Sequence, residues 1–409
     1  MVNSRRAALS GIVLLVVLSL FLQLPLAAAG GFLMLLVGAL AAYYQRYGLM
    51  GVALRVKIHP GSVFPDEQTE LALAIGNPKR VPLPFLTLEQ EWPAAVTPVG
   101  RPELLGDSSK PGRKLFRLFT HLGGRQQVSR RYQLTSSRRG RHVFGPQTLR
   151  LYDPIGLLFS ERHYERPRDL ASYVVYPKLR PVRSLPAVLR AGGEWRARSL
   201  LEDPTLLRSL RQWQAGDAMK QIDWRASARS DDDLYVRQPE SVSRLEVYLG
   251  LNLQSSRETW GGLRQDYIEE AVSLTASLAW DLLGTKHPVG VYANGMLEGE
   301  ATRTLGVVLR PAAHARQLQH VLTALGEVQQ AAAYLDLGRL LVAEAGRAMA
   351  GSVFVVITAF VSPALTPVLL YLRQRGHKVV VVHFDAPEAG DGPIPAGVVA
   401  LTPAHLWAS

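Results

Sequence analysis

The sequence predicts a membrane-anchored, multidomain protein, in which a transmembrane helical hairpin is followed by an antiparallel β-sandwich and a doubly wound α/β domain. Three observations predict this order. Residues 7–45 contain no Asp, Glu, Lys, Arg or His, short alternating strands follow them, and from residue 244 apolar strands alternate with helical patterns. The 409 residues, 47% of them hydrophobic, suffice for two or three domains with a core each. Because the chain has no cysteine, disulfides, zinc–thiolate sites, iron–sulfur sites and a cysteine nucleophile are excluded.

The uncharged run of 39 residues is long enough for two membrane spans. A spanning helix needs about 20 apolar residues. We therefore expect transmembrane helices at about 7–24 and 27–44, with the helix breaker Pro25 in the turn between them. Tyr43 and Tyr44 then lie where an aromatic belt meets the membrane surface. The alternative is a cleaved signal peptide, but the apolar core of a signal peptide has only about 7–15 residues.

The charges beside this run predict its orientation. Arg5 and Arg6 precede it, Arg46 and Lys57 follow it, and the turn at Pro25 carries no charge. The positive-inside rule then places both ends, and the domains after the second span, in the cytoplasm. An exported envelope protein would require the signal-peptide interpretation.

Excess positive charge is concentrated next to the predicted membrane hairpin. Residues 45–175 carry 20 basic and 11 acidic side chains, a net of +9, whereas residues 176–409 carry 24 and 23, a net of +1. A basic juxtamembrane surface attracts anionic lipid headgroups at about 1 kcal/mol per residue. The run Arg138-Arg139-Gly140-Arg141 either contacts such headgroups or forms a solvated loop. We expect no nucleic-acid partner, because no recognition-helix, zinc-finger or aromatic RNA-binding pattern accompanies the charge.

Residues 52–176 have the pattern of an antiparallel β-sandwich. Apolar and polar residues alternate with a period of two at 54–59, 71–75 and 128–134, and Gly and Pro turn signals separate these segments. Such alternation is typical of strands with one face in a core and one face in water.

Residues 244–409 have the pattern of a parallel sheet covered by helices on both faces. Apolar strands are predicted at 245–253, 289–292, 353–357 and 379–384, and helices at 267–283, 313–325, 335–349 and 363–376. Ligands of such sheets bind beyond the carboxyl ends of the strands, which here means 252–256, 358–362 and Asp385.

The connecting segment 177–243 contains a dense pattern of charged and aromatic residues. The two tryptophans and the apolar residues among the charges argue against a fully exposed face. We therefore expect an Asp–Arg lattice, a partly buried network of paired Asp and Arg side chains, that packs this segment against a domain. The pattern consists of Arg211, Trp213, Gly216, Asp217, Lys220, Ile222, Asp223, Trp224, Ser227, Ala228, Arg229, Arg237 and Glu240.

This pattern resembles the signature of the bacterial domain-of-unknown-function family 58. The resemblance implies two N-terminal spans, a β-rich domain that ends near Asp153 to Leu157, the signature, and a domain similar to von Willebrand factor A. Together with the orientation predicted from the flanking charges, we expect a multi-pass protein of the bacterial inner (plasma) membrane with cytoplasmic soluble domains. The resemblance also implies a partner, because the family is often encoded beside MoxR-type AAA+ ATPases. No molecular activity comes with the resemblance.

The metal positions of a von Willebrand factor A domain are altered here. Such domains hold a divalent cation through Asp-x-Ser-x-Ser after the first strand, with a further Thr and Asp on other loops. The matching residues are Asn252, Gln254 and Ser256, and the later carboxylate position falls at Ala359. Because Mg²⁺ requires oxygen ligands that include carboxylates, we expect no metal and no cofactor.

The sequence therefore favours a non-enzymatic scaffold or interaction protein. It contains no P-loop, Gly-x-Gly-x-x-Gly, His-Glu-x-x-His or Gly-x-Ser-x-Gly motif, and it identifies no small-molecule substrate. The expected partners are the lipid bilayer with its anionic headgroups and a MoxR-type ATPase. The alternative is a hydrolase or other enzyme that uses Asp217 and Asp223 at the rim of the sheet.

Overall fold

The structure is a computed structural model. It describes Phe21, Ala187, Met219 and residues 25–156, 158–165, 170–185, 203–214, 222–228, 234–240, 246–257, 264–297, 306–329 and 336–408, with the backbone alone for 203–211 and 237–240. The chain divides into two compact units, Met1–Tyr176 and Pro177–Ser409.

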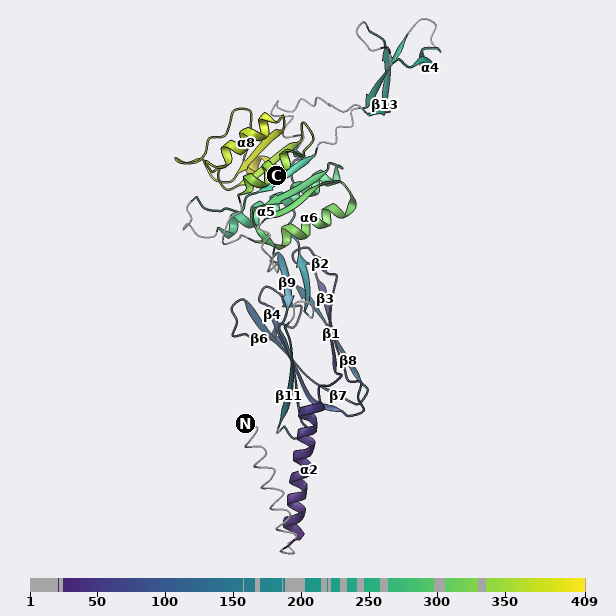
Figure 1. Cartoon of the computed structure of the whole chain (residues 1–409), viewed down its shortest axis with the longest axis vertical. Helices are drawn as coiled ribbons and strands as arrows, with labels where there is room; N and C mark the ends of the chain where they lie inside the picture. The colour runs from purple at the N-terminus through teal and green to yellow at the C-terminus, as the bar shows by residue number, and fades with distance from the viewer. Residues whose placement is uncertain are drawn as a thin grey trace. The chain divides into compact units, whose positions relative to one another are not determined.

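The first unit begins with one long apolar helix, α2 (Pro25–Tyr47) (Figure 1). Among the described residues it is the one helix long and apolar enough to cross a membrane. The predicted turn at Pro25 is wrong, because Pro25 is the first residue of this helix, where a missing N–H leaves no helical hydrogen bond unmade. The other predicted span, 7–24, lies outside the described residues apart from Phe21.

Two cations of the β-domain cap the carboxyl end of α2. The Lys79 Nζ donates to the carbonyl oxygen of Tyr47 at 2.9 Å and also to that of Gly48. The Arg162 Nη2 donates to the carbonyl oxygen of Leu49 at 2.8 Å. The last carbonyls of a helix lack helical partners and carry partial negative charge, so cations stabilise them. Burial, together with the neighbouring Arg162, lowers the pKa of Lys79.

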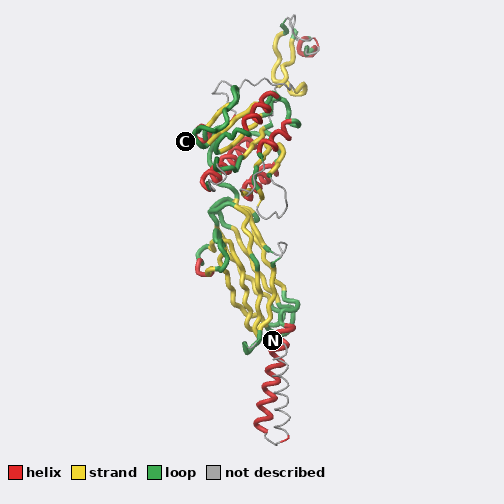
Figure 2. Tube along the Cα trace, turned by 60° about the vertical axis from the view of Figure 1, so that its left-hand side comes forward, coloured by secondary structure: helices red, strands yellow, loops and turns green. Residues whose placement is uncertain are grey.

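Strands make up most of the rest of the first unit (Figure 2), and its two larger sheets are antiparallel and share one core. The period of two predicted for 71–75 is confirmed, because β3 alternates between buried and half-buried residues. Trp92 lies in the core, fully buried and stacked on Phe116 with ring centroids 4.7 Å apart. The four-stranded sheet has the order β1 (Ala53–His59), β3 (Thr69–Gly76), β8 (Gln127–Thr135), β5 (Thr97–Pro98); the five-stranded sheet has the order β11 (Phe159–Tyr164), β10 (Gln147–Tyr152), β4 (Leu83–Pro93), β7 (Arg113–Leu122), β6 (Leu105–Asp107).

A small third sheet lies at the end of this domain opposite α2. It has the order β2 (Ser62–Val63), β12 (Ala171–Val175), β9 (Gly140–Phe144), and β2 runs parallel to β12. The basic run 138–141 leads into β9, after the Thr135 end of β8. The other end of β8, at Gln127, pairs with Gly76 beside the loop that contacts α2. Arg138 to Arg141 are therefore separated from α2 by most of the length of a strand, which argues against the headgroup contact suggested for them.

The second unit contains a six-stranded sheet in which all neighbours are parallel except one. Numbered along the chain, its strands lie in the order 3-2-1-4-5-6, which is that of doubly wound α/β folds, and the third strand is antiparallel. Every residue of three central strands is buried, so both faces are covered. The strands are β18 (Val307–Ala312), β16 (Val289–Ala293), β15 (Val247–Leu251), β20 (Val353–Thr358), β21 (Lys378–His383) and β22 (Val399–Leu401).

Helices cover this sheet in two pairs. α7 (Leu337–Ala345) and α8 (Leu365–Gln374) pack on the face that carries Tyr248 and Phe354. α5 (Gln265–Gly284) contacts β15, β16 and β20 and packs against α6 (Ala315–Glu327). Smaller elements complete the unit: the pair β17 (Met296–Leu297) and β19 (Val328–Gln329), and α9 (Pro403–Leu406).

The predicted connection 177–243 contains regular structure that the pattern of charges did not indicate. β13 (Asp203–Gln212) and β14 (Tyr235–Glu240) pair as an antiparallel two-stranded sheet, and the short helix α4 (Trp224–Ser227) lies between them in the sequence. The signature pattern therefore lies on a hairpin.

Candidate functional site

The carboxyl edge of the parallel sheet is closed by a hydrogen-bond network around Asn252. This residue follows β15 and is buried. Its Oδ1 accepts from Asn294 Nδ2 at 2.8 Å and from the Gln254 N–H at 3.1 Å, and its Nδ2 donates to Thr358 Oγ1 at 3.0 Å. Thr358 Oγ1 in turn donates to the carbonyl oxygen of Phe360 at 2.7 Å. The side chain of Asn252 therefore joins β15, the end of β16 and β20.

The other positions expected for a cation are occupied by neutral groups. Gln254 Nε2 donates to the carbonyl oxygen of Ser256 at 3.3 Å, and Ala359 is buried without a polar side chain. Across the described ranges, no three His, Cys, Asp or Glu residues are grouped so that they could hold a metal ion. The expectation of no metal stays a prediction, since only a binding experiment tests it.

Arginine side chains occupy the rim beside this network. The Arg257 guanidinium donates to both carboxylate oxygens of Asp391, at 2.8 and 2.9 Å, and lies 3.2 Å from a carboxylate oxygen of Glu388. Arg264 Nη1 donates to Asp385 Oδ2 at 2.6 Å. The contacts with Arg257, its hydrogen bond above all, hold the pKa of the Asp391 carboxyl below its usual range.

The sequence analysis found Asp385 at this rim but missed its arginine partners. The residues of the Arg257–Asp391 pair are 134 positions apart, so spacing gives no signal for it. A weaker signal was present, because acidic residues follow the strand predicted at 379–384 and the basic Arg257 follows the strand predicted at 245–253.

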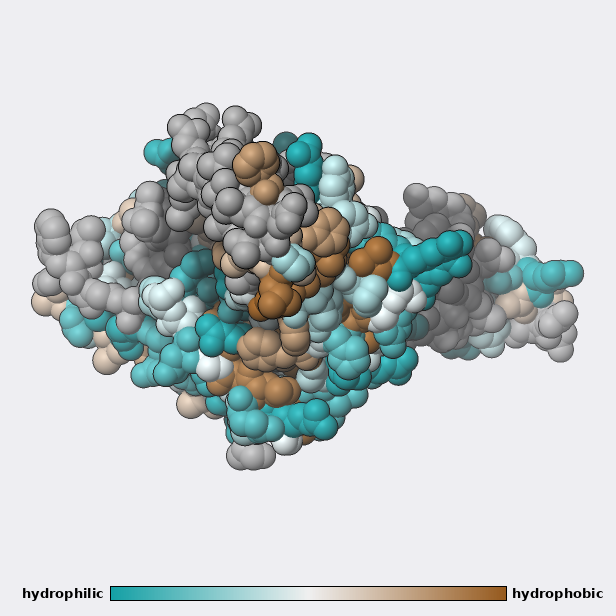
Figure 3. Space-filling view, turned by 90° about the horizontal axis from the view of Figure 1, so that it is seen from below, coloured by the Kyte–Doolittle hydropathy of each residue, from teal (hydrophilic) through white to brown (hydrophobic). Residues whose placement is uncertain are grey.

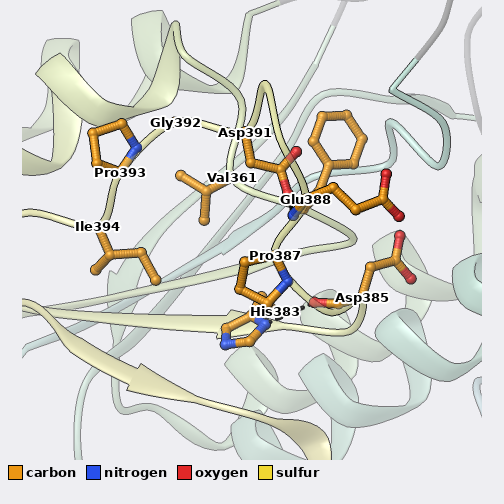
Figure 4. A pocket seen from close by; sticks show the side chains of 10 residues that line it. Val361, His383, Asp385, Pro387, Glu388, Asp391, Gly392, Pro393 and Ile394 are labelled. Atoms are coloured by element: carbon orange, nitrogen blue, oxygen red, sulfur yellow. Dashed lines mark hydrogen bonds between the residues drawn. The ribbon is translucent and has the colours of Figure 1, made fainter.

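A pocket of about 330 Å³ opens beside these ion pairs (Figure 4). Val361, Pro393 and Ile394 provide apolar walls, while Asp385 and Glu388 provide carboxylates. An apolar pocket with a carboxylate rim suits an aliphatic or basic side chain better than an anion. Its carboxylates are already paired with arginines, which favours a binding role over proton transfer.

The signature residues that the structure describes hold the hairpin together. Asp223 is the N-cap of α4, and its Oδ1 accepts from the N–H groups of Arg225 and Ala226, both at 3.1 Å. Ser227 Oγ accepts from the Tyr235 N–H at 2.8 Å. Ile222 is buried and forms an isolated bridge with Val236 of β14. These contacts fold α4 back onto β14.

The two signature tryptophans are more exposed than the lattice interpretation expects. Trp224 is 61% exposed and Trp213 is 39% exposed. A two-stranded sheet with one helical turn has too few layers to bury an indole ring, which explains the difference. Met219, at 72%, and Leu234, at 41%, are exposed on the same segment.

The other signature residues lie on the paired strands, directly after α4 or outside the described residues. Gly216, Asp217, Lys220 and Arg229 lie outside the described residues. Arg211, Arg237 and Glu240 lie on β13 and β14, where the backbone alone is described, and Ala228 follows α4. The lattice, and the Asp217–Asp223 pair of the enzyme alternative, stay predictions.

Comparison with known families agrees with the resemblance of the signature. The model of the family described as "Protein of unknown function DUF58" matches residues 209–404, just under half of the chain. This range covers the hairpin from Ser209 and the parallel sheet. No curated protein matches the chain.

Solved structures similar to this chain share little of its length. The CARDB domain of a Pyrococcus furiosus protein is 13% identical over 30% of this chain and 86% of its own, with a TM-score of 0.19. A non-cellulosomal cohesin from Archaeoglobus fulgidus is 9% identical over 30% of this chain and 90% of its own, with a TM-score of 0.18. A type II cohesin domain from Acetivibrio cellulolyticus is 9% identical over 30% of this chain and 91% of its own, with a TM-score of 0.19.

Proposed function

We propose that this chain is a membrane-anchored, non-enzymatic interaction protein. In this proposal it lies in the bacterial inner membrane as a multi-pass protein with cytoplasmic domains. It acts with a MoxR-type AAA+ ATPase in the maturation of a protein or complex. The proposal assigns no catalytic residue and no cofactor.

The apolar helix α2 supports the anchoring. Its 23 residues are about 35 Å long at 1.5 Å per residue, which exceeds the roughly 30 Å of a bilayer's hydrocarbon core. Arg46 lies in its last turn, and Arg55 and Lys57 lie beyond it on β1 with exposed side chains. Basic residues at this end of the helix favour a cytoplasmic location for the β-domain.

The strand order supports a von Willebrand factor A-like domain in the second unit. The order 3-2-1-4-5-6, with the third strand reversed, combines a doubly wound sheet with one antiparallel strand. In this proposal the domain keeps the scaffold and has lost the metal. Asn252 binds neighbouring strands where a carboxylate would bind a cation.

Exposed aromatic side chains on the signature hairpin carry the interaction part of the proposal. Trp213 and Trp224 are the most telling, because tryptophan is enriched among the residues that dominate binding energy at protein interfaces. Met219 and Leu234 add apolar surface on the same segment. Exposed apolar groups of this kind commonly mark interaction sites.

Co-purification tests the proposal. The full chain is expressed with the MoxR-type ATPase encoded nearest to it, solubilised in mild detergent and captured by a C-terminal tag. We expect the ATPase to co-purify with the parent chain and with Trp280→Ala, a control for a tryptophan that is 47% exposed on α5. We expect Trp224→Ala to lose the ATPase. Equal recovery with Trp224→Ala and Trp280→Ala would contradict the hairpin as the binding surface, and no recovery with the parent would contradict the partner.

A further inference from the structure

Four aromatic side chains, three of them exposed and one half-buried, form a row on the outer face of the five-stranded sheet. Phe159 of β11 pairs with Tyr152 of β10, and Tyr152 pairs with Phe85 of β4. Phe119 of β7 pairs with Thr87, the next outward residue of β4. Phe85 is 55% exposed and Phe119 is 73% exposed, although large aromatic rings are usually well buried. The aromatic row is defined here as Phe85, Phe119, Tyr152 and Phe159.

This row lies at the end of the sheet from which α2 emerges. Tyr44 of α2 is buried and donates its Oη to the carbonyl oxygen of Pro82 at 3.0 Å, immediately before β4 begins. α2 also contacts β10 and β11 near the turn that joins them. That turn presents Ile155, which is 50% exposed. The row is thus next to the carboxyl end of the apolar helix.

Exposed cations lie on α2 and on two loops at the same end of the domain. Arg46 lies in the last turn of α2. Arg80 and Arg125 are exposed on two adjacent loops, which are joined by the hydrogen bond from the Arg125 N–H to the carbonyl oxygen of Lys79 at 2.7 Å. Viewed from the helix end, apolar residues, those of α2 among them, gather in the middle of the view and hydrophilic ones border them (Figure 3).

We propose that the aromatic row and Ile155 insert into the interfacial layer of the bilayer that α2 crosses, with Arg46, Arg80 and Arg125 on anionic lipid headgroups. This inference rests on the proposed membrane anchoring and deepens it by naming the lipid-binding surface of the β-domain. Rings with exposed apolar faces favour the membrane interface, and basic side chains beside them add attraction to anionic lipid. The continuity of the row with the apolar helix selects lipid over a protein partner.

The absence of cysteine from the chain makes a single-label test direct. Phe159→Cys and Phe119→Cys carry an environment-sensitive fluorophore in two full-length variants, reconstituted into phosphatidylcholine vesicles with and without phosphatidylglycerol. His163→Cys is the matched control, because it lies on the same strand and outer face as Phe159, four residues along. Four residues of strand span about 13 Å, more than the roughly 5–10 Å depth of interfacial insertion.

We expect a blue-shifted emission at positions 159 and 119. We also expect quenching by brominated lipid about twofold or more stronger at position 159 than at 163, since about 13 Å separates these two labels. Position 119 lies at the level of Thr87, two residues of strand or about 7 Å from the level of 163, so its quenching should be intermediate. Quenching should increase with phosphatidylglycerol. A water-like emission at both row positions in vesicles would overturn the inference. A label that is shielded from water in vesicles but is not quenched by brominated lipid would also overturn it, because a protein surface would then cover the row.

Flotation of the same vesicles after alkaline carbonate treatment separates this result from the anchoring itself. If the parent chain fails to float, the proposed membrane anchoring fails. If it floats and the row labels remain in water, only the insertion of the row fails.

Discussion

Replacing Arg257 with methionine should destabilise the second unit, because this arginine neutralises the rim of the sheet. Arg257→Met keeps most of the length and apolar volume of the side chain and removes the guanidinium. Asp391 then keeps, among the described residues, a hydrogen bond from the Glu388 N–H at 2.9 Å. The nearby carboxylates of Asp385 and Glu388 also lose a cation.

The expected magnitude depends on the burial of the pair. The side chain of Asp391 is 10% exposed and that of Arg257 is 26% exposed, with two hydrogen bonds between them. An exposed pair contributes about 0–1 kcal/mol, whereas removing one partner of a buried pair costs about 3–5 kcal/mol. This pair lies between these limits, so we expect a loss of about 2–3 kcal/mol in the free energy of unfolding. For a unit of this size that corresponds to a decrease in Tm of about 4–12 °C.

Calorimetric unfolding of the detergent-solubilised full chain measures the change. Arg310→Met is the matched control, because the Arg310 side chain is 67% exposed and its Nε lies 3.7 Å from Glu344, which Arg347 also contacts. We expect the control to melt within about 2 °C of the parent, since Arg310 is exposed and the buried Glu344 keeps the hydrogen bond from Arg347 at 2.9 Å. If Arg257→Met melts with this control, the reasoning that Arg257 holds the rim together is refuted.

Four further predictions rest on described contacts. Because Arg257 lowers the folded-state pKa of Asp391, the pair should stabilise the unit fully above about pH 4, and this stabilisation should be lost as the pH falls through that pKa. The stability of Arg257→Met, measured by acid unfolding, should not show this loss. Asn252→Asp buries a carboxylate beside the Thr358 hydroxyl, so the Tm of this variant should fall at pH 7 and partly recover in acid. At the same position, titration calorimetry of the parent chain with millimolar Mg²⁺ should show no binding site. Asp223→Ala should cost about 0.5–2 kcal/mol in amide-exchange protection of α4, while Asp223→Asn, still a cap, should cost little; equal losses would instead favour a charge lattice. Lys79→Met should lower stability by about 1–2 kcal/mol in thermal unfolding, since it removes a charged donor from a helix end; an unchanged Tm would contradict the capping role.

Much of the fold could be predicted because burial imposes a period on the sequence. β3 alternates as expected of a strand with one face in a core, and the continuous apolar run at 353–357 became the fully buried β20. β18 was missed because its segment contains Arg310 and Pro311, which are unusual within a strand and are tolerated at the edge of the sheet.

The chemistry of the rim was harder to predict than the sheet beneath it. The position of Asn252 after the first strand was visible in the sequence, but its partners Asn294 and Thr358 are 42 and 106 residues away. The hairpin from β13 to β14 escaped prediction for a different reason. A two-stranded sheet with few neighbours needs no regular alternation, so no period marks it.

The capped junction between α2 and the β-domain has a mechanical consequence. Lys79 and Arg162 bind the carbonyls at the end of the helix from two separate segments, so the helix and the domain turn together. If α2 spans a bilayer as proposed, any tilt by which the helix matches its apolar length to the hydrocarbon core is passed on to the domain. A thicker membrane reduces that tilt and a thinner one increases it. Bilayer thickness thereby sets the angle at which the β-domain stands on the membrane surface, with the helix acting as the lever.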